Sequence, residues 1–275
     1  MTAVWLSLLL QAQAAVPPSL PGHPPIALAS QAETLRRYPG PATQGVAVGP
    51  ADVYAVSNFT LTRFDKATGE KKAEWVGDRA RFPHINSCAV IGAEPAPELV
   101  CASSNYPASP HISTVEVFDP ADLRHVRSVS LGLGTGSATW VDRHDGFWWV
   151  MFAHYDGRGG EAPRDHRHTT LVKFDDHWRR TQAWALPASI LERIAPMSIS
   201  GGGWGPDGRL YLTGHDLPEL YVVTLPEGGG VLDYVETRGI EAQGQAVDWD
   251  ESQPGTLYGI TRSSREILAM RVLSR

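Results

Sequence analysis

The chain has 275 residues, of which 42% are hydrophobic and 20% charged, a composition typical of a globular protein with a sizeable core. Its formal charge of −6, without a lysine- or arginine-rich run, excludes a surface built for nucleic acid or an anionic membrane. Nine tryptophans and 27 glycines, with few candidate helices, favour a sheet-rich fold built on tight turns.

The chain begins with the pattern of an export signal. An apolar run, Val4 to Leu10, precedes Ala12-Gln13-Ala14, which is a small-x-small cleavage pattern. We therefore predict a signal peptide over residues 1–14 and a secreted or periplasmic protein. The n-region lacks a basic residue, so a disordered apolar tail is the alternative, and the run is too short to span a bilayer. The proline-rich residues 15–30 are interpreted as an extended leader, which leaves a single domain over residues 31–275.

Five similar units follow one another in this domain. Each has a first strand rich in small residues, an apolar second strand and a third strand, and three of the five third strands carry Phe-Asp at the same place. The first strands start at Gln44, His84, Gly136, Ser200 and Gln245, the second at Val53, Leu99, Trp149, Leu210 and Leu257, and the third at Leu61, Val115, Leu171, Leu220 and Ile267. Such a repeat, with a period of roughly 40 to 65 residues, is typical of a β-propeller.

We therefore predict an all-β fold, a five-bladed β-propeller of four-stranded antiparallel blades. The last unit reaches the end of the chain before its fourth strand, and residues 33–38 can supply that strand and close the ring. The one convincing helix, about Ala188 to Arg193, falls in the connection between the third and fourth blades. A β-sandwich is the chief alternative, because short alternating strands alone do not exclude it.

The two cysteines, Cys88 and Cys101, fall on strands predicted to be adjacent in the second blade. Export would permit a disulfide between them. The alternative is a pair of small buried side chains, since cross-strand disulfide geometry is demanding. A catalytic role for either cysteine is not expected.

Polar residues recur at equivalent places in the five units. In a propeller, the loop after each second strand and the start of the next first strand open on the same face around the central funnel, and we call this face the mouth. The residues at these positions are Asn58, Asn105, His154, His215 with Asp216, and Arg262 after second strands, and Gln44, His84 with Asn86, Ser137, Ser200 and Gln245 at first-strand starts. Because this polarity follows the repeat, we predict a ligand site at the mouth.

Three histidines of the mouth suggest chemistry. His84, His154 and His215 are candidate ligands for a divalent transition metal, because neutral imidazoles from separate strands can form an open three-nitrogen site. The alternatives are that they hydrogen-bond backbone groups, or that His154 or His215 is a general acid or base oriented by Asp216. Asp216 is equally explained as a turn residue before Leu217-Pro218.

The remaining polar residues of the mouth are candidates to hold a substrate. They are Asn58, Asn86, Asn105, Gln245 and Arg262. Trp204 is a further candidate, because an indole that faces the funnel can stack on a sugar ring. The catalytic candidates are thus His84, His154, His215 and Asp216.

Three local patterns are distantly similar to the plant-type glutaminyl cyclases. They are Gln44-Gly45 at the opening of the first blade, Thr68-Gly69 after the first Phe-Asp turn, and Gly203 to Gly208 in the fourth blade. The resemblance spans most of the mature chain and implies a secreted five-bladed propeller. It also implies acidic first-strand starts, where this chain has His84-Ile85-Asn86 and Gln245-Ala246 instead, so the cyclisation of N-terminal glutamine is not carried over. The architecture also resembles uncharacterised exported bacterial propellers, and propeller lyases and lactonases that use funnel histidines.

The sequence therefore predicts an exported enzyme, a hydrolase, lyase or cyclising enzyme, that acts on a small polar or carbohydrate substrate in the funnel. The alternative is a propeller that binds a glycan or small ligand without catalysis, which the amide-rich mouth favours. A protein-docking scaffold would carry an exposed apolar rim, of which the sequence gives no sign. We expect a monomer.

Overall fold

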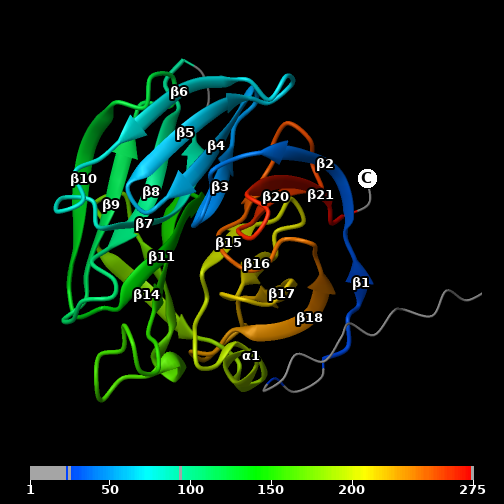
Figure 1. The fold of residues 1–275 in the computed structure, drawn as a ribbon. Coiled ribbons are helices and arrows are strands. Elements are labelled where there is room, and N and C mark those ends of the chain that lie inside the picture. The colour runs from blue at the N-terminus through cyan, green and yellow to red at the C-terminus, as the bar shows by residue number, and fades with distance from the viewer. Residues whose placement is uncertain (1–22, 24–25, 93–94, 274–275) are drawn as a thin grey trace, which may run out of the picture.

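Five antiparallel sheets form a ring, as the sequence predicts (Figure 1). The computed structural model describes residues 23, 26–92 and 95–273, so the predicted signal peptide and most of the predicted leader lie outside the described residues. The blades, each given from its inner to its outer strand, are β3 (Gly45–Val48), β4 (Asp52–Ser57), β5 (Thr60–Asp65) and β6 (Lys71–Val76); β7 (His84–Ile91), β8 (Glu98–Ser104), β9 (Ile112–Phe118) and β10 (His125–Leu133); β11 (Ser137–His144), β12 (Phe147–Ala153), β13 (Thr170–Phe174) and β14 (Arg180–Ala185); β15 (Gly201–Trp204), β16 (Leu210–Thr213), β17 (Glu219–Thr224) and β18 (Asp233–Gly239); and β19 (Asp248–Trp249), β20 (Thr256–Thr261), β21 (Glu266–Arg271) and β2 (Glu33–Pro39).

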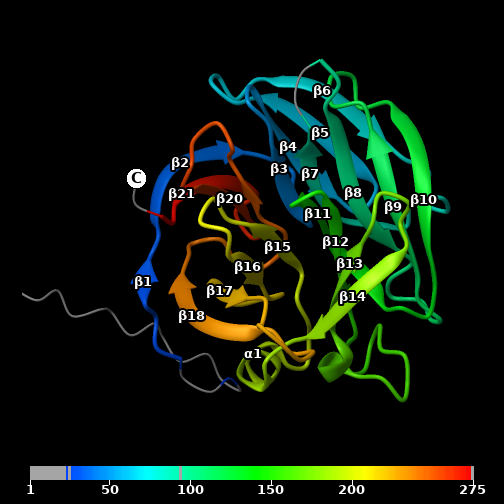
Figure 2. The same cartoon turned by 180° about the vertical axis from the view of Figure 1, so that it is seen from behind.

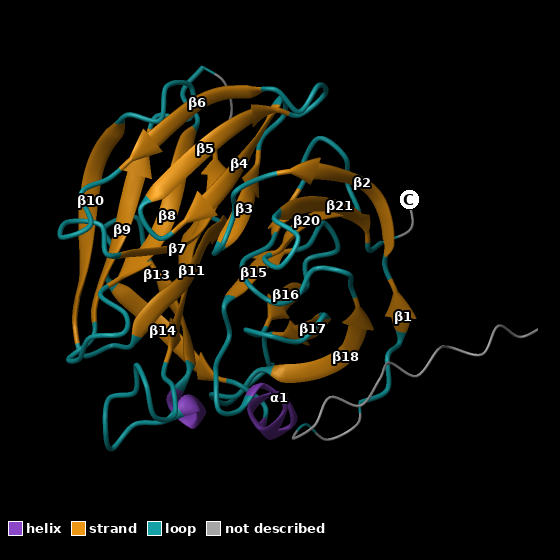
Figure 3. Cartoon of the chain, in the orientation of Figure 1, coloured by secondary structure: helices purple, strands orange, loops and turns teal. Residues whose placement is uncertain are grey.

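Helical structure is confined to two short pieces among the described residues (Figure 3). Helix α1 (Ala188–Ile194) lies between the third and fourth blades, where the sequence predicts it. A 3₁₀ helix, η1 (His166–His168), lies in the long loop after β12. No helix in the described part of the chain is long and apolar enough to cross a membrane.

The inner strands crowd around the axis of the ring. A side chain on Gly45 would bring its Cβ to 2.3 Å from the Cβ of Ala246, and one on Gly201 would reach 2.4 Å from the Cα of the same residue. Small residues at the inner-strand starts are therefore required by the close approach of neighbouring blades. The outer strands β6 and β14 instead expose most of their residues, so hydrophobicity falls from the axis outward.

The N-terminal part of the described chain closes the ring. Strand β2 pairs antiparallel with β21, with Tyr38 opposite Ile267, and completes the fifth blade as predicted. A short strand, β1 (Ser30–Gln31), pairs in parallel with β18 of the fourth blade. Figure 2 shows β1 and β2 running along the outer edge of the molecule beside these two blades. The ring is therefore closed by β2 and the last strand, β21, which lie in the same sheet.

A second tie joins the first and fifth blades at the closure. The ammonium group of Lys66 forms an ion pair with Asp250 at 2.5 Å, and both side chains are buried. The same ammonium donates hydrogen bonds to the carbonyl of Gly49 at 3.2 Å and to the Ser252 hydroxyl at 2.9 Å. Buried charges need such partners, so this cluster fixes how the two blades meet.

The two cysteines lie opposite each other on β7 and β8 and are joined by a disulfide. The sequence left open a disulfide or two buried thiols, and the structure has the disulfide. The bridge links the inner strand of the second blade to its neighbour.

Candidate functional site

Most of the predicted mouth residues lie where the sequence places them, at or beside the starts of inner strands and directly after second strands, whereas Gln245 lies before β19. His84 and Ser137 begin β7 and β11, while Asn58 and His154 follow β4 and β12. Their side chains, however, do not all serve one common site, and they separate into the groups described below.

His84, Asn86 and Ser137 belong to a polar network between the second and third blades. The Asn86 amide donates to the carbonyl of Ala138 at 2.7 Å, and the hydroxyl of Ser137 donates to that of Ser104 at 2.8 Å. Burial lowers the pKa of His84 to about 4, and a hydrogen bond with Asn86 offsets part of this effect. Asn86 therefore joins two blades, and His84 is a neutral ring at pH 7.

His215, Asp216, Arg262 and Gln245 form the second group. The imidazole Nδ1 of His215 lies 2.6 Å from a carboxylate oxygen of Asp216, and the Arg262 guanidinium lies 3.9 Å from that same oxygen. The Gln245 amide donates to the carbonyl of His215 at 3.0 Å. A carboxylate that orients an imidazole is the arrangement proposed for Asp216, and this pair lies at the surface.

The two remaining asparagines of the mouth are Asn105 and Asn58. The Asn105 amide donates to the carbonyl of Pro110 at 3.0 Å, and its oxygen accepts from the backbone N–H of Ile112 at 2.9 Å, so this side chain shapes its own loop. The side-chain oxygen of Asn58 is buried without a hydrogen-bond partner.

His154 lies apart from His84 and His215. Its ring is buried beside His111 and Glu161, and one ligand atom from each of these three residues lies within 4.8 Å of the others. The pKa of His154 is lowered to about 4, mainly by burial and then by His111. The three predicted metal histidines are not among the potential ligand groups found in the described residues, whereas His154 is in one with different partners.

A cavity of about 790 Å³ lies at the opposite end of the funnel from the predicted mouth. All five inner strands contribute to it at the points where they end, through Val48, Ile91, Asp142, Trp204 and Asp248. Its size is within the range of small-molecule sites. We call it the axial cavity.

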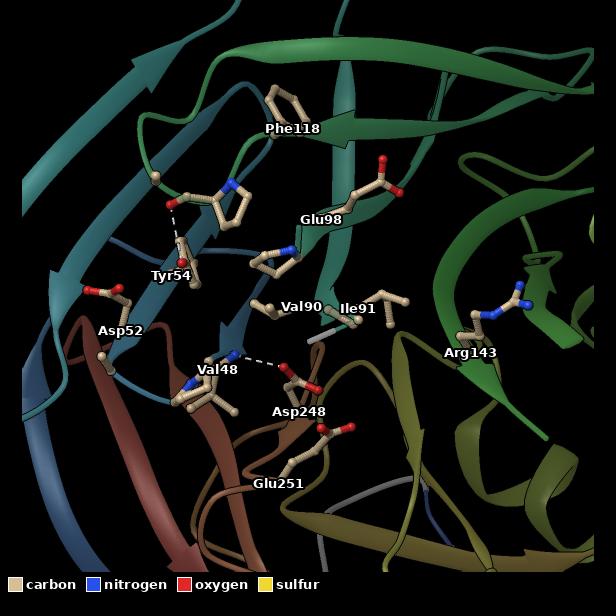
Figure 4. A pocket seen from close by; sticks show the side chains of 18 of the residues that line it. Val48, Asp52, Tyr54, Val90, Ile91, Glu98, Phe118, Arg143, Asp248 and Glu251 are labelled. Atoms are coloured by element: carbon tan, nitrogen blue, oxygen red, sulfur yellow. Dashed lines mark hydrogen bonds between the residues drawn. The ribbon is translucent and has the colours of Figure 1, made fainter. Parts of the chain in front are cut away.

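Six acidic side chains lie in the wall of the axial cavity. Asp52, Glu98 and Asp119 are paired with arginines, and the other three are Asp142, Asp248 and Glu251. Figure 4 shows Asp248 and Glu251 side by side on one wall and Arg143 on another. The carboxylate of Asp142 accepts the backbone N–H groups of Arg143 at 2.7 Å and Trp204 at 3.1 Å. Asp248 accepts the backbone N–H of Val48 at 2.7 Å.

Asp142, Asp248 and Glu251 lack positively charged partners in the described part of the chain, and burial raises the pKa of two of them. Burial raises the pKa of Asp142 to about 6, with a smaller effect from Glu251, and burial together with Asp142 raises the pKa of Asp248 well above its ordinary value. No ion pair among the described residues involves Asp142, Asp248 or Glu251. The basic group of Arg143 is already paired with Asp176 at 2.6 Å. Acidic side chains outnumber the basic ones, Arg63 and Arg143, in the cavity wall, so the cavity suits ligands with hydrogen-bond donors and disfavours anions.

Trp204 lies in the wall of this cavity. Its indole stacks on the ring of His144, with centroids 4.2 Å apart and an angle of 9° between the planes. Trp249, which also lines the cavity, packs edge-on against Tyr211. The predicted sugar-stacking residue thus faces the funnel, at the end opposite to the mouth.

Asp142 and Asp248 were not among the predicted site residues. A signal for them does exist, because the inner strands of the third and fifth blades both place an aspartate next to valine near their ends, in Trp140-Val141-Asp142 and Val247-Asp248-Trp249. The sequence directs attention to the strand starts, where the side chains of His84 and Gln245 lie, and the cavity lies at the other end.

Comparisons with known proteins agree with the fold. No family model matches the chain, and no curated protein matches its sequence. Among solved structures, glutaminyl cyclase from Myxococcus xanthus is similar with a TM-score of 0.54 and 9% identity, over 88% of this chain and 97% of that one. The PQQ-bound aldose sugar dehydrogenase from Streptomyces coelicolor is similar with a TM-score of 0.53 and 12% identity, over 90% and 99% of the two chains. At these identities the likeness is one of fold: the chain is a five-bladed β-propeller, and its fold is similar to those of these two proteins.

Proposed function

We propose that the chain binds a small molecule rich in hydroxyl or amino groups, of the carbohydrate class, in the axial cavity and acts on it as a hydrolase or lyase. The observation that carries this proposal is the set of three uncompensated carboxylates, Asp142, Asp248 and Glu251, in a cavity of about 790 Å³. Carboxylates accept hydrogen bonds from hydroxyl and ammonium donors, and the indoles of Trp204 and Trp249 offer apolar surface beside them.

Proton transfer is the chemistry that these residues support. A carboxyl group with a pKa of about 6, as for Asp142, has both protonated and ionised forms available near neutral pH, which suits a general acid or base. Glu251 would share the cavity with it and favour positive charge that develops on a substrate. Burial favours the protonated form of Asp248, which can donate a hydrogen bond to the substrate. The backbone N–H donors to Asp142 and Asp248 hold these carboxylates in fixed positions.

A second candidate function is binding without catalysis. The hydrogen bond from Trp204 N–H to Asp142 joins the third and fourth blades, and the one from Val48 N–H to Asp248 joins the fifth and first. Both carboxylates therefore also clamp neighbouring inner strands, a role that needs no turnover. The His215–Asp216 pair at the mouth remains a predicted acid–base pair for a ligand that enters from that side.

The test begins with the ligand. Equilibrium dialysis of the purified protein against a panel of neutral sugars, amino sugars and acidic sugars, read by mass spectrometry, should show binding of neutral or amino sugars and exclusion of the acidic ones. Asp142→Asn should lower turnover of the bound sugar roughly 10²- to 10⁴-fold. Asp145→Asn is the matched control, because Asp145 is exposed in the turn that follows β11 and lies outside the cavity wall.

The outcomes separate the two functions. Binding without any product in the wild type would favour the non-catalytic propeller. Turnover that survives Asp142→Asn and Asp248→Asn, and is lost in His215→Ala, would show that catalysis takes place at the mouth and not in the axial cavity. Binding of acidic sugars alone would contradict a site that disfavours anions.

We also propose that the protein is exported. The proposal is supported by the N-terminal pattern of residues 1–14 and by the Cys88–Cys101 disulfide, since such bonds persist in oxidising compartments. Expression of the full chain in a bacterial host, followed by fractionation and N-terminal sequencing, should give a periplasmic product that begins near residue 15. An uncleaved cytoplasmic product would contradict it.

A further inference from the structure

The loops that follow the second strands of the second and third blades meet around two buried histidines. His111 is fully buried and His154 is 2% exposed, and their ring centroids lie 5.5 Å apart. Glu161, from the long loop after β12, reaches the same place, with a carboxylate oxygen 3.5 Å from Nδ1 of His111. This group lies outside the residues that line the axial cavity.

The hydrogen bonds of the two rings fix their tautomers. Nε2 of His111 lies 2.9 Å from the carbonyl oxygen of Gly159, and Nε2 of His154 lies 3.2 Å from that of Thr135. A carbonyl oxygen only accepts, so each Nε2 must carry the proton, and Nδ1 of each neutral ring carries a lone pair. Both Nδ1 atoms are buried without a hydrogen-bond partner.

We propose that His111, His154 and Glu161 bind one divalent transition ion of the zinc class, with the two Nδ1 atoms and a Glu161 oxygen as ligands. Two imidazole nitrogens and one carboxylate are a donor set that zinc uses, with the fourth position left to water. Ligands of a tetrahedral zinc ion lie roughly 3.4 Å from one another, which the 3.5 Å between His111 and Glu161 matches. The carbonyls of Gly159 and Thr135 orient the rings as outer partners of metal-bound histidines commonly do.

A second group of potential metal ligands lies on the same loop, and its side chains are already hydrogen-bonded. Asp156, Asp165 and His166 also lie within ligand distance of one another. There, however, Nδ1 of His166 is hydrogen-bonded to Asp156 at 2.8 Å, and Asp165 accepts from the side chain and backbone of Arg167. The members of this second group already have hydrogen-bond partners, within the group or in Arg167, so it serves as an internal control for the first.

The ion would fasten the long loop of the third blade onto the loop of the second. Glu161 is the only one of the three proposed ligands that comes from the middle of that loop, and the backbone N–H of His111 already donates to it at 3.4 Å. Arg164 lies 3.9 Å from the Glu161 carboxylate, and its guanidinium donates a hydrogen bond to the carbonyl of Gly134 at 2.6 Å. Removing this positive charge should therefore strengthen binding of a dication.

The experiment uses the full chain and the metal alone. After dialysis against a chelator, titration with Zn²⁺ at neutral pH should give one ion per chain and a rise in the melting temperature. Titration with Co²⁺ should give the visible absorption of a tetrahedral nitrogen and oxygen site. Glu161→Gln should weaken binding at least roughly tenfold, Arg164→Gln should strengthen it, and Asp156→Asn should leave it unchanged.

The titrations of the wild type test the site even where a variant fails to fold. Absence of stoichiometric Zn²⁺ and Co²⁺ binding would overturn the site and assign the two lone pairs to water. Binding that survives Glu161→Gln and is lost in Asp156→Asn would show that the ion binds to Asp156, Asp165 and His166 instead. That result would also overturn the proposal. Because the readouts are metal content, absorption and melting temperature, they stand apart from any result on the axial cavity.

Discussion

The carboxyl group of Asp142 lies in the wall of the axial cavity, where burial favours its protonated form and raises its pKa from 3.8 to about 6. Between these two values the folded protein binds more protons at this site than the unfolded chain does. The free energy of unfolding should therefore fall as the pH rises from about 4 to about 6, by at most about 3 kcal/mol from this residue.

Asp142→Asn should flatten that part of the stability profile. The measurement is urea unfolding at pH 4, 5, 6 and 7 on the wild type and the variant, with Asp145→Asn as control because that side chain is exposed. A variant profile parallel to the wild type over this range would show that Asp142 does not titrate there.

The contacts and pKa values of single side chains were harder to predict from the sequence than the strands or the fold. The pairing of His215 with Asp216 follows from their adjacency in the sequence, and it is present. The partners of His154 could not be read in the same way, because His111 and Glu161 come from two irregular loops whose paths depend on packing. The raised pKa of Asp142 likewise depends on how closely other blades surround it.

At the scale of one blade, the Cys88–Cys101 disulfide joins β7 to β8 across 13 residues. A cross-link over a loop of this length restricts the unfolded chain and contributes about 3 kcal/mol. Replacing both cysteines by alanine should lower the free energy of unfolding by roughly 2–4 kcal/mol, since both sites are buried and alanine is tolerated there by size.

Guanidinium unfolding under oxidising and reducing conditions measures this contribution. The wild type should lose about the same stability on reduction as the double variant loses by substitution, and the double variant should not respond to reductant. Equal stability of all forms would show that the bridge adds nothing.

The strands were predictable because their signals are local, and the one clear exception has a physical reason. Residues 245–249 were predicted as one strand, and only Asp248–Trp249 pair with β20. The N–H of Gln245 bonds instead to the carbonyl of Gly214, and that of Ala246 bonds to the carbonyl of Gln44. Neighbouring blades thus compete for this backbone, and a single-strand pattern does not reveal that competition.

For the whole molecule, the junction between the first and fifth blades depends on the buried Lys66–Asp250 pair. Lys66→Met removes one charge and leaves Asp250 buried without it, which should cost on the order of 3–5 kcal/mol. Lys71→Met is the matched control, because its pair with Glu74 is exposed and should contribute less than about 1 kcal/mol. Thermal and urea unfolding of the two variants would decide, and similar losses for both would contradict the importance of the closure cluster.

The number of blades and the closure by residues 33–38 were predicted from the repeat and are confirmed. The end of the funnel that holds the cavity was not predictable, because it depends on how large side chains fill each end. At the mouth, the rings of Tyr106, Tyr155 and His84 pack together with centroids about 5 Å apart. At the other end the ends of the inner strands surround the axial cavity.

The pairing of β2 with β21 also ties folding to the direction of protein synthesis. Strand β2 leaves the ribosome before β21, with more than 200 residues between them. The fifth blade can therefore form only after the segments of the other four blades have been made, and until then β2 has no partner in its sheet. A chain that crosses a membrane unfolded, as a signal peptide implies, would reach the far side before its ring could close.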